Sequence, residues 1–186
     1  MNLPNKLTIG RIIAVPFFVG FYMTGFYLVS FFLFIAASFT DMFDGKIARK
    51  HNLVTNFGKI MDPLADKILV YSAFALLVES GLVAAWMMII ILAREFAISG
   101  MRTVAASDGI VIAAGMSGKI KTVLQMIAVP ALLLRNVQMP EWLFWFEQLD
   151  KFVAFTFLWG SLIMTVYSGV EYILKNKSVF SMENKA

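Results

Sequence analysis

Residues 41–66, DMFDGKIARKHNLVTNFGKIMDPLAD, place four aspartates at the ends of two otherwise apolar stretches of chain. On insertion scales each ionised carboxylate inside a bilayer costs about 2.5–3.5 kcal/mol. Four of them in one short stretch therefore need compensating partners or a function. The connection at residues 51–56 is short, so the two stretches are expected to form helices that are antiparallel neighbours.

The composition predicts an integral membrane protein. Of the 186 residues, 60% are hydrophobic, and the mean hydropathy is +0.78, which exceeds what the core of a soluble protein requires. The chain has no cysteine and one histidine. Disulfides, cysteine nucleophiles and His/Cys metal clusters are therefore excluded. Any metal site must have oxygen ligands, which suit Mg²⁺, Mn²⁺ or Ca²⁺.

The apolar stretches are long enough to cross a bilayer, which takes about 20 residues. We expect an all-α protein with six transmembrane helices, over residues 7–26, 27–50, 57–80, 82–106, 117–134 and 151–174. Residues 139–149, MPEWLFWFEQL, predict an interfacial amphipathic segment before the last helix. Residues 1–186 are expected to form a single membrane-embedded domain.

The positive charges predict the orientation in the membrane. Fourteen of the 16 Lys and Arg residues fall on one side of the six-helix arrangement, and only Arg135 and Lys151 fall on the other. Cytoplasmic loops carry the excess of Lys and Arg. Both termini and the aspartate stretch are thus expected to face the cytoplasm, in a multi-pass protein of the cytoplasmic membrane. The bilayer, and not a nucleic acid, is the expected partner of this basic chain.

Helical spacing groups the aspartates on two faces. One face holds Asp41, Asp44, Gly45 and Ala48, and the other holds Gly58, Asp62 and Asp66, each within an arc of about 100°. Facing carboxylates repel one another unless divalent cations neutralise them, so these faces favour a two-metal site. The small residues leave room for a flat or elongated ligand, and Arg49 can bind a phosphate through two N–H donors.

Two other interpretations of these carboxylates stay open. The first is a polar helix end, with aspartates solvated near the interface and small residues that permit close helix packing. The second is a divalent-cation transporter, because carboxylates inside a membrane often mark ion pathways. Transporters usually bind their ions at the midplane, whereas this stretch lies toward the cytoplasmic helix ends.

Basic residues further along the chain predict an anion-binding pocket. Arg94 and Arg102 lie about 80° apart around one helix, so both can face one cavity, and Lys119 lies at the start of the next helix. Such a pocket suits an acceptor alcohol that already carries a phosphate. The structural alternative is that Arg94 pairs with Glu95, and Lys121 is expected to be an ordinary cytoplasmic anchor.

The spacing Asp-x2-Asp-Gly-x2-Ala-Arg-x8-Gly-x3-Asp-x3-Asp, from Asp41 to Asp66, resembles the full signature of the CDP-alcohol phosphotransferase family. The resemblance implies a homodimeric membrane enzyme that transfers a substituted phosphate from a CDP-linked donor to an alcohol and releases CMP. It also implies two bound Mg²⁺ ions, with Mn²⁺ as the alternative.

The same resemblance implies roles for individual residues. Asp41, Asp44 and Asp62 would be metal ligands, and Asp66 would be the general base with a contact to the second metal. The CDP-donor site would comprise Asp41, Gly45, Ala48, Arg49 and Gly58. Asn5, Thr8 and Arg11 are candidates for further polar contacts at the cavity edge, although helix-start and anchor roles explain them nearly as well.

Three further segments, DPLADK (62–67), AREFAISGMRTVAA (93–106) and GKIKTVLQ (118–125), resemble the phosphatidylglycerophosphate synthase branch of that family. This implies CDP-diacylglycerol as donor and sn-glycerol 3-phosphate as acceptor. The acceptor phosphate would bind in the pocket predicted from Arg94, Arg102 and Lys119. Another acceptor, such as inositol phosphate or serine, is the alternative within the family.

Overall fold

The computed structural model describes most of the chain. The described residues are 3–50, 56–107, 109–110, 112–113, 115–138, 140 and 144–177. Within these ranges the side chains of residues 3–4, 41–50, 56–57, 59–60, 144 and 146 lie outside the description.

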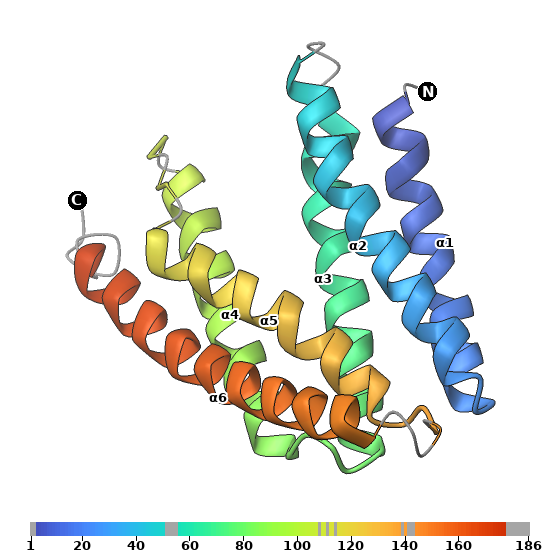
Figure 1. Ribbon diagram of the computed structural model, residues 1–186. Coiled ribbons are helices and arrows are strands. Elements are labelled where there is room, and N and C mark those ends of the chain that lie inside the picture. The colour runs from blue at the N-terminus through green and yellow to red at the C-terminus, as the bar shows by residue number, and fades with distance from the viewer. Residues whose placement is uncertain are drawn as a thin grey trace.

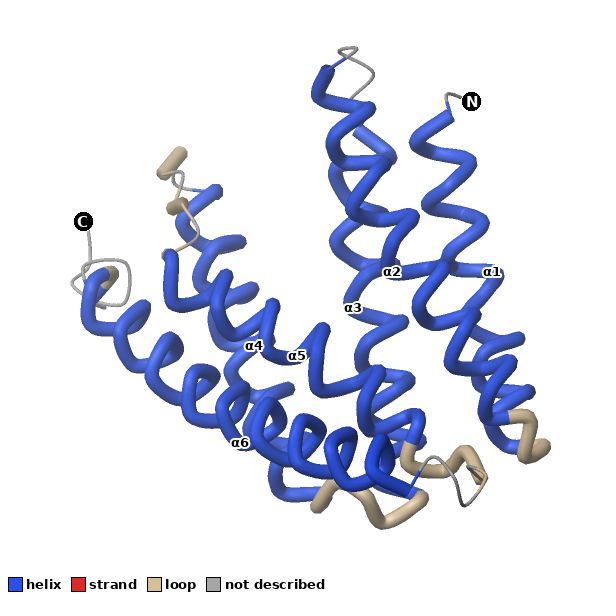
Figure 2. The backbone as a smooth tube through the Cα atoms, viewed as in Figure 1, coloured by secondary structure: helices blue, strands red, loops and turns tan. Residues whose placement is uncertain are grey.

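Six helices make up the described part of the chain (Figure 1). They are α1 (Leu3–Met23), α2 (Tyr27–Lys50), α3 (Asn56–Glu79), α4 (Ala85–Ser107), α5 (Met116–Leu134) and α6 (Phe144–Lys175). Figure 2 shows helices and loops only among the described segments. The expected all-α fold class is confirmed, and the first five helices begin and end within about four residues of their predicted bounds.

The last helix differs most from the prediction, because α6 begins at Phe144 and not at residue 151. Residues 144–149, expected in a separate interfacial segment, form the first turns of this 32-residue helix. Trp145 and Leu149 are exposed while Asp150 is buried, so this part of the helix is amphipathic. The physical reason is local, since no proline or glycine follows Pro140 until Gly160.

The helices form two groups of three in sequence order, α1–α3 and α4–α6, which diverge toward the end that carries both termini (Figure 1). Helices α2 and α3 contact α5, and α3 also contacts α4. The core draws side chains from all six helices; its fully buried members include Phe18, Phe34, Phe74, Leu77, Ile91, Leu132 and Leu158. Apolar packing therefore holds the two groups together.

Both ends of the chain lie at the same end of the bundle as the end of α2 and the start of α3, with the amino terminus on the side of α2 and the carboxyl terminus on the far side (Figure 1). The turns after α1 and α3 lie at the opposite end. Gly81 ends α3 with a φ of +75°, a conformation that glycine adopts without a steric penalty, as expected after Glu79 and Ser80. The aspartate stretch thus shares one end of the bundle with both termini.

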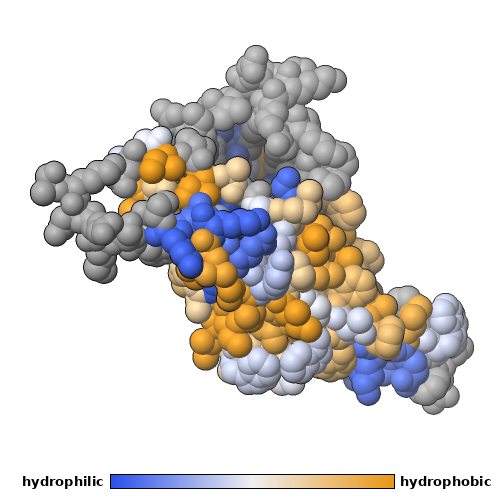
Figure 3. All heavy atoms as spheres, turned by 90° about the vertical axis from the view of Figure 1, so that its left-hand side faces the viewer, coloured by the Kyte–Doolittle hydropathy of each residue, from blue (hydrophilic) through white to orange (hydrophobic). Residues whose placement is uncertain are grey.

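Among the residues whose side chains the structure describes, three helices are long and apolar enough to cross a membrane, over Asn5–Met23, Met116–Leu134 and Glu147–Lys175. Helix α2 also contains a shorter apolar stretch, over Tyr27–Thr40. On the face drawn in Figure 3, hydrophobic side chains lie between two hydrophilic regions, one toward the end that carries the termini and one at the opposite end. These features agree with the predicted integral membrane protein. The cytoplasmic orientation stays a prediction.

Candidate active site

Asp62 and Asp66 lie one turn apart on α3, in its half nearer the end that carries both termini. Asp62 accepts a hydrogen bond from the hydroxyl of Thr8 on α1. Thr8 is only 1% exposed, so this bond is largely shielded from solvent. It connects α1 directly to α3 and places Thr8 beside Asp62, one of the predicted metal ligands.

The other residues of the predicted metal and donor site are only partly described. Gly58 on α3 is buried, as are Asn5 and Arg11 on α1. Five predicted residues lie in the last turns of α2, and their side chains fall outside the description: Asp41, Asp44, Gly45, Ala48 and Arg49. The end of α2 lies beside the start of α3, so the backbone brings the two aspartate-bearing ends together. The roles of these residues stay predictions.

The donor chemistry of this region fits Mg²⁺. Carboxylate oxygens are the ligands that hard divalent cations prefer. Among the described side chains no group of three or more His, Asp or Glu residues could hold an ion. The described side chains include those of Asp62 and Asp66 but not those of Asp41 and Asp44. The predicted ligand set also includes Asp41 and Asp44 of α2, whose side chains lie outside the description.

On α4, Glu95 is the centre of a network of ion pairs. Its Oε1 lies 2.6 Å from Nη1 of Arg94 and 2.5 Å from Nζ of Lys121. Its Oε2 lies 3.9 Å from Nζ of Lys67, which donates a hydrogen bond of 2.7 Å to Ser99. A buried carboxylate is stable only with such partners. The network joins α3, α4 and α5.

The position of Lys121 corrects its interpretation as an ordinary cytoplasmic anchor. An anchor keeps its ammonium group in water, whereas Lys121 is only 4% exposed. Its charge is paired with Glu95 inside the protein. Lys121 is therefore a structural element of the site wall.

Arg94 extends from α4 to α6, where its Nη2 donates a hydrogen bond of 3.0 Å to Ser168. Arg94 also pairs with Glu95, as the structural alternative predicted. A guanidinium group has five N–H donors, so these two contacts leave donors available for a ligand. The pairing and a role in binding are thus compatible.

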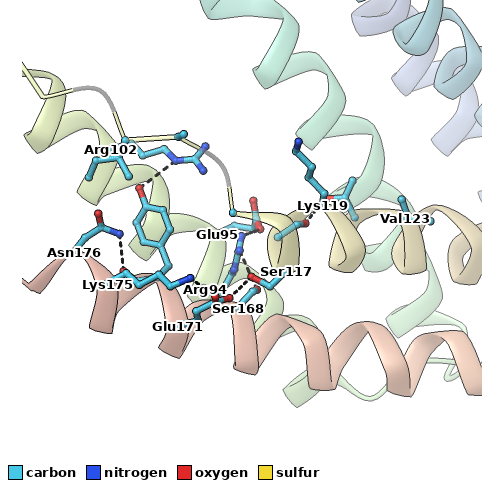
Figure 4. A pocket seen from close by; sticks show the side chains of 16 residues that line it. Arg94, Glu95, Arg102, Ser117, Lys119, Val123, Ser168, Glu171, Lys175 and Asn176 are labelled. Carbon is cyan, nitrogen blue, oxygen red and sulfur yellow. Dashed lines mark hydrogen bonds and ion pairs between the residues drawn. The ribbon is translucent and has the colours of Figure 1, made fainter.

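A cavity of about 520 Å³ lies among α4, α5 and α6 (Figure 4). Its lining includes the three residues predicted at the acceptor phosphate, which are Arg94, Arg102 and Lys119. The lining also includes the polar residues Glu95, Ser117, Thr122, Ser168, Glu171, Tyr172, Lys175 and Asn176. The structure therefore brings the predicted acceptor residues to one cavity. Acceptor binding there stays a prediction.

The two carboxylates of this cavity are already paired. Besides the pairs of Glu95, Glu171 lies 2.6 Å from Nζ of Lys175 and accepts a hydrogen bond of 2.5 Å from Ser117. The guanidinium of Arg102 lies 5.5 Å from the ring centre of Tyr172. Within the described part of the chain, neither Arg102 nor Lys119 forms an ion pair. The cavity is therefore electrostatically suited to an anion.

A second, smaller cavity of about 60 Å³ lies among α3, α4 and α5. Asp66 and Gln125 line it, and the amide nitrogen of Gln125 is buried without a hydrogen-bond partner in the described part of the structure. Glu95 and Thr122 line both cavities. The predicted general base and the predicted phosphate-binding residues thus line neighbouring spaces with a common wall.

The comparison with known proteins decides the family. Residues 1–167 match the CDP-alcohol phosphatidyltransferase family. The chain belongs to this family. The resemblance inferred from the aspartate stretch is therefore confirmed.

Several members of the family are similar to this chain along nearly its whole length. It is 46% identical to a CDP-diacylglycerol–glycerol-3-phosphate 3-phosphatidyltransferase of Bacillus subtilis, over 98% of this chain and 99% of that protein. A protein of the same name from Rickettsia felis is 36% identical, over 96% of this chain and 97% of its own. A third protein of this name, from Shigella flexneri serotype 5b, is 34% identical, over 92% of this chain and 93% of that protein.

The contribution of α6 to the larger cavity was not predicted from the sequence. Ser168, Glu171 and Tyr172 line the cavity, yet none of them was a candidate. A signal was present, because four buried polar residues recur at helical spacing in this apolar helix: Ser161, Thr165, Ser168 and Tyr172. Such a stripe predicts a face turned toward protein and away from lipid.

Proposed function

We propose that this protein transfers the phosphatidyl group of CDP-diacylglycerol to sn-glycerol 3-phosphate, giving phosphatidylglycerophosphate and CMP. The observation that carries the proposal is the match along nearly the whole chain to proteins named for this reaction. The cavity with Arg102 and Lys119 outside any described ion pair supports a phosphorylated acceptor. The positive charges of Arg102 and Lys119 favour a phosphorylated acceptor over serine, which carries no phosphate.

In this proposal the acceptor lies across the two neighbouring cavities. Its phosphate binds Arg94, Arg102 and Lys119, because guanidinium and ammonium groups match phosphate oxygens in charge and hydrogen bonding. Its terminal hydroxyl, the one furthest from the phosphate, then lies toward Asp66, past the residues Glu95 and Thr122 that line both cavities. Binding in this way orients the hydroxyl before the reaction.

Asp66 acts as the general base. It accepts the proton of the acceptor hydroxyl while the hydroxyl oxygen forms a bond to the phosphatidyl phosphorus of the donor. The bond between that phosphorus and the oxygen of CMP breaks, and CMP leaves with the electron pair. General-base catalysis of this kind contributes roughly 10²–10⁴-fold.

Asp41, Asp44 and Asp62 would hold two Mg²⁺ ions, with Asp66 in contact with the second; Mn²⁺ is the alternative. Bound Mg²⁺ supplies neutralisation of the donor diphosphate and of the charge that develops on leaving CMP. The hydrogen bond from Thr8 orients the carboxylate of Asp62, as partners of metal ligands commonly do. Gly45, Ala48, Arg49 and Gly58 would line the CDP site, with Asn5 and Thr8 at its edge.

The proposal includes a homodimer in the cytoplasmic membrane with the active site facing the cytoplasm. The fourteen-to-two distribution of basic residues supports this orientation. Substrates that carry nucleotide or phosphate groups would then reach the site from the cytoplasm.

The decisive experiment offers several acceptors to the purified protein with CDP-diacylglycerol and Mg²⁺. We expect CMP release with sn-glycerol 3-phosphate and little with inositol phosphate or serine. CMP release with a different acceptor only would show that this acceptor, and not sn-glycerol 3-phosphate, is the substrate, while the reaction class would stand. Absence of release with every acceptor, from protein that remains folded, would contradict the reaction class.

Membership of this family favours phosphatidyl transfer over divalent-cation transport. The transport alternative is tested with proteoliposomes that contain no nucleotide. We expect no Mg²⁺ or Mn²⁺ flux above that of protein-free vesicles. Flux that requires Asp62 would favour transport.

A further inference from the structure

The side chain of Arg94 passes between two glycines on neighbouring helices. A Cβ atom added at Gly169 on α6 would lie 3.1 Å from Cγ of Arg94. One added at Gly118 on α5 would lie 3.3 Å from its Nη2. Both distances are shorter than ordinary van der Waals contact between such atoms. The two glycines thus form a slot, here called the Arg94 slot.

This close approach distinguishes the two positions from the other glycines whose surroundings the structure describes. An added Cβ at Gly160, also on α6, would lie 3.8 Å from Leu124 and therefore in ordinary contact. At Gly100 and Gly20 it would meet nothing within 4 Å. Glycine weakens a helix interior relative to alanine, so a helical glycine that leaves space for one particular side chain has a structural reason to be there.

Arg94 is held at both ends of its side chain. Its guanidinium contacts Glu95 and Ser168, while its Cγ lies against Gly169. Because Cγ is close to the backbone of α4, it cannot move aside without turning the whole side chain. A displacement of a few tenths of an ångström at Cγ is enlarged at the guanidinium, which lines the acceptor cavity.

We propose that Gly169, together with Gly118, is a positioning residue for the phosphorylated acceptor. The Arg94 slot keeps the guanidinium in the orientation that Glu95 and Ser168 stabilise, with its remaining donors toward the cavity. This inference rests on the proposed function, since it assigns the affinity for the acceptor phosphate to Arg94. Gly169 acts through Arg94 and does not itself touch the acceptor.

The competing explanation is that Gly169 serves only the packing of α5 against α6. A double-mutant cycle separates the two, because residues that act through one contact have non-additive effects. The four proteins are the wild type, Gly169→Ala, Arg94→Ala and the double variant. Gly160→Ala is the matched control, with the same substitution on the same helix.

The measurement is CMP release as a function of glycerol 3-phosphate and, separately, of CDP-diacylglycerol. We expect Gly169→Ala to raise the KM for glycerol 3-phosphate about tenfold, equivalent to about 1.4 kcal/mol, while the KM for CDP-diacylglycerol and the unfolding temperature stay unchanged. In the Arg94→Ala background the same substitution should have no further effect. Gly160→Ala should behave as the wild type.

Equal effects of Gly169→Ala in the two backgrounds would overturn the proposal in favour of helix packing, as would an unchanged KM. If Gly169→Ala fails to fold, Gly118→Ala takes its place, because its added Cβ would lie 3.3 Å from Nη2 of Arg94, compared with 3.1 Å from Cγ at Gly169, and therefore requires a smaller adjustment. Failure of the proposed function is distinguishable, since the wild type itself would then show no CMP release with glycerol 3-phosphate.

Discussion

At the residue scale, Asp66 is the group on which the proposed chemistry depends most. It lines the small cavity next to the one proposed to bind the acceptor, and it lies one turn beyond Asp62. We expect Asp66→Asn to lower turnover by roughly 10²–10⁴-fold, because the amide cannot accept the hydroxyl proton. Rates of CMP release measure this. The matched control is Glu79→Gln, at the opposite end of the same helix, which should retain full activity.

Metal binding by the Asp66→Asn variant separates the two roles assigned to this residue. If Asp66 is mainly the base, Mn²⁺ binding measured by paramagnetic resonance should largely survive the substitution. Parallel loss of metal binding and turnover would show that Asp66 is mainly a ligand.

Arg102 differs from Arg94 in having no acidic partner within the described chain, and it lies over the ring of Tyr172. We expect Arg102→Ala to raise the KM for glycerol 3-phosphate by about tenfold or more, since hydrogen bonds to charged groups contribute about 1.5–3 kcal/mol. Steady-state kinetics with each substrate varied in turn measure this. Arg102→Lys should retain part of the affinity, because the charge remains while the planar fork is lost.

Arg135→Ala is the control for this series, because Arg135 pairs with Glu147 at the opposite end of the bundle. A rise in the KM for CDP-diacylglycerol in Arg102→Ala, without one for the acceptor, would place Arg102 in the donor site.

At the element scale, the pair of Glu95 and Lys121 joins α4 to α5. The side chains of Glu95 and Lys121 are 14% and 5% exposed, so removing one charge leaves the other buried. We expect Glu95→Gln to reduce the free energy of unfolding by about 3 kcal/mol, the usual result of breaking a buried ion pair. Thermal unfolding in detergent measures this change.

The double variant Glu95→Gln, Lys121→Met tests whether the instability of Glu95→Gln comes from leaving the charge of Lys121 buried without a partner. It removes both charges, so we expect it to recover most of the stability that Glu95→Gln loses. Activity should stay low, because Arg94 keeps a weaker partner. Equal instability of the single and double variants would mean that Glu95 acts mainly through Arg94 and Lys67.

At the scale of the whole molecule, both chain ends share one end of the bundle with the aspartate-bearing helix ends (Figure 1). The chain has no cysteine, so single cysteines can be introduced without altering other residues. We expect Gln138→Cys to react with a membrane-impermeant thiol reagent in intact cells. Lys177→Cys should react only after the membrane is permeabilised, because the basic side is predicted to face the cytoplasm.

Reaction of Lys177→Cys in intact cells would reverse the predicted orientation. Reaction of both variants would contradict a single orientation. The activity of each variant, measured alongside, shows that the fold is retained.

Much of the architecture follows from the sequence by itself. Apolar runs separated by turn residues predicted six helices, and Gly81 marked the end of α3. The aspartate spacing identified the family, which the match over residues 1–167 confirmed. These features are local, because helix period, helix ends and motif spacing depend on residues that are close in the chain. The start of α6 was missed because an aromatic interfacial segment and a helix start have similar composition.

Only the tertiary structure decided which groups meet around the cavity. Lys121 and Glu95 are 26 residues apart, and Arg94 and Ser168 are 74 apart. No local pattern relates such residues, because their contact depends on how α4, α5 and α6 pack and on the rotamers that this packing allows. The same packing passes Arg94 between Gly118 and Gly169. The sequence thus determined the helices and the spacing of the aspartates, while helix packing determined the charge and shape of the cavity among α4, α5 and α6.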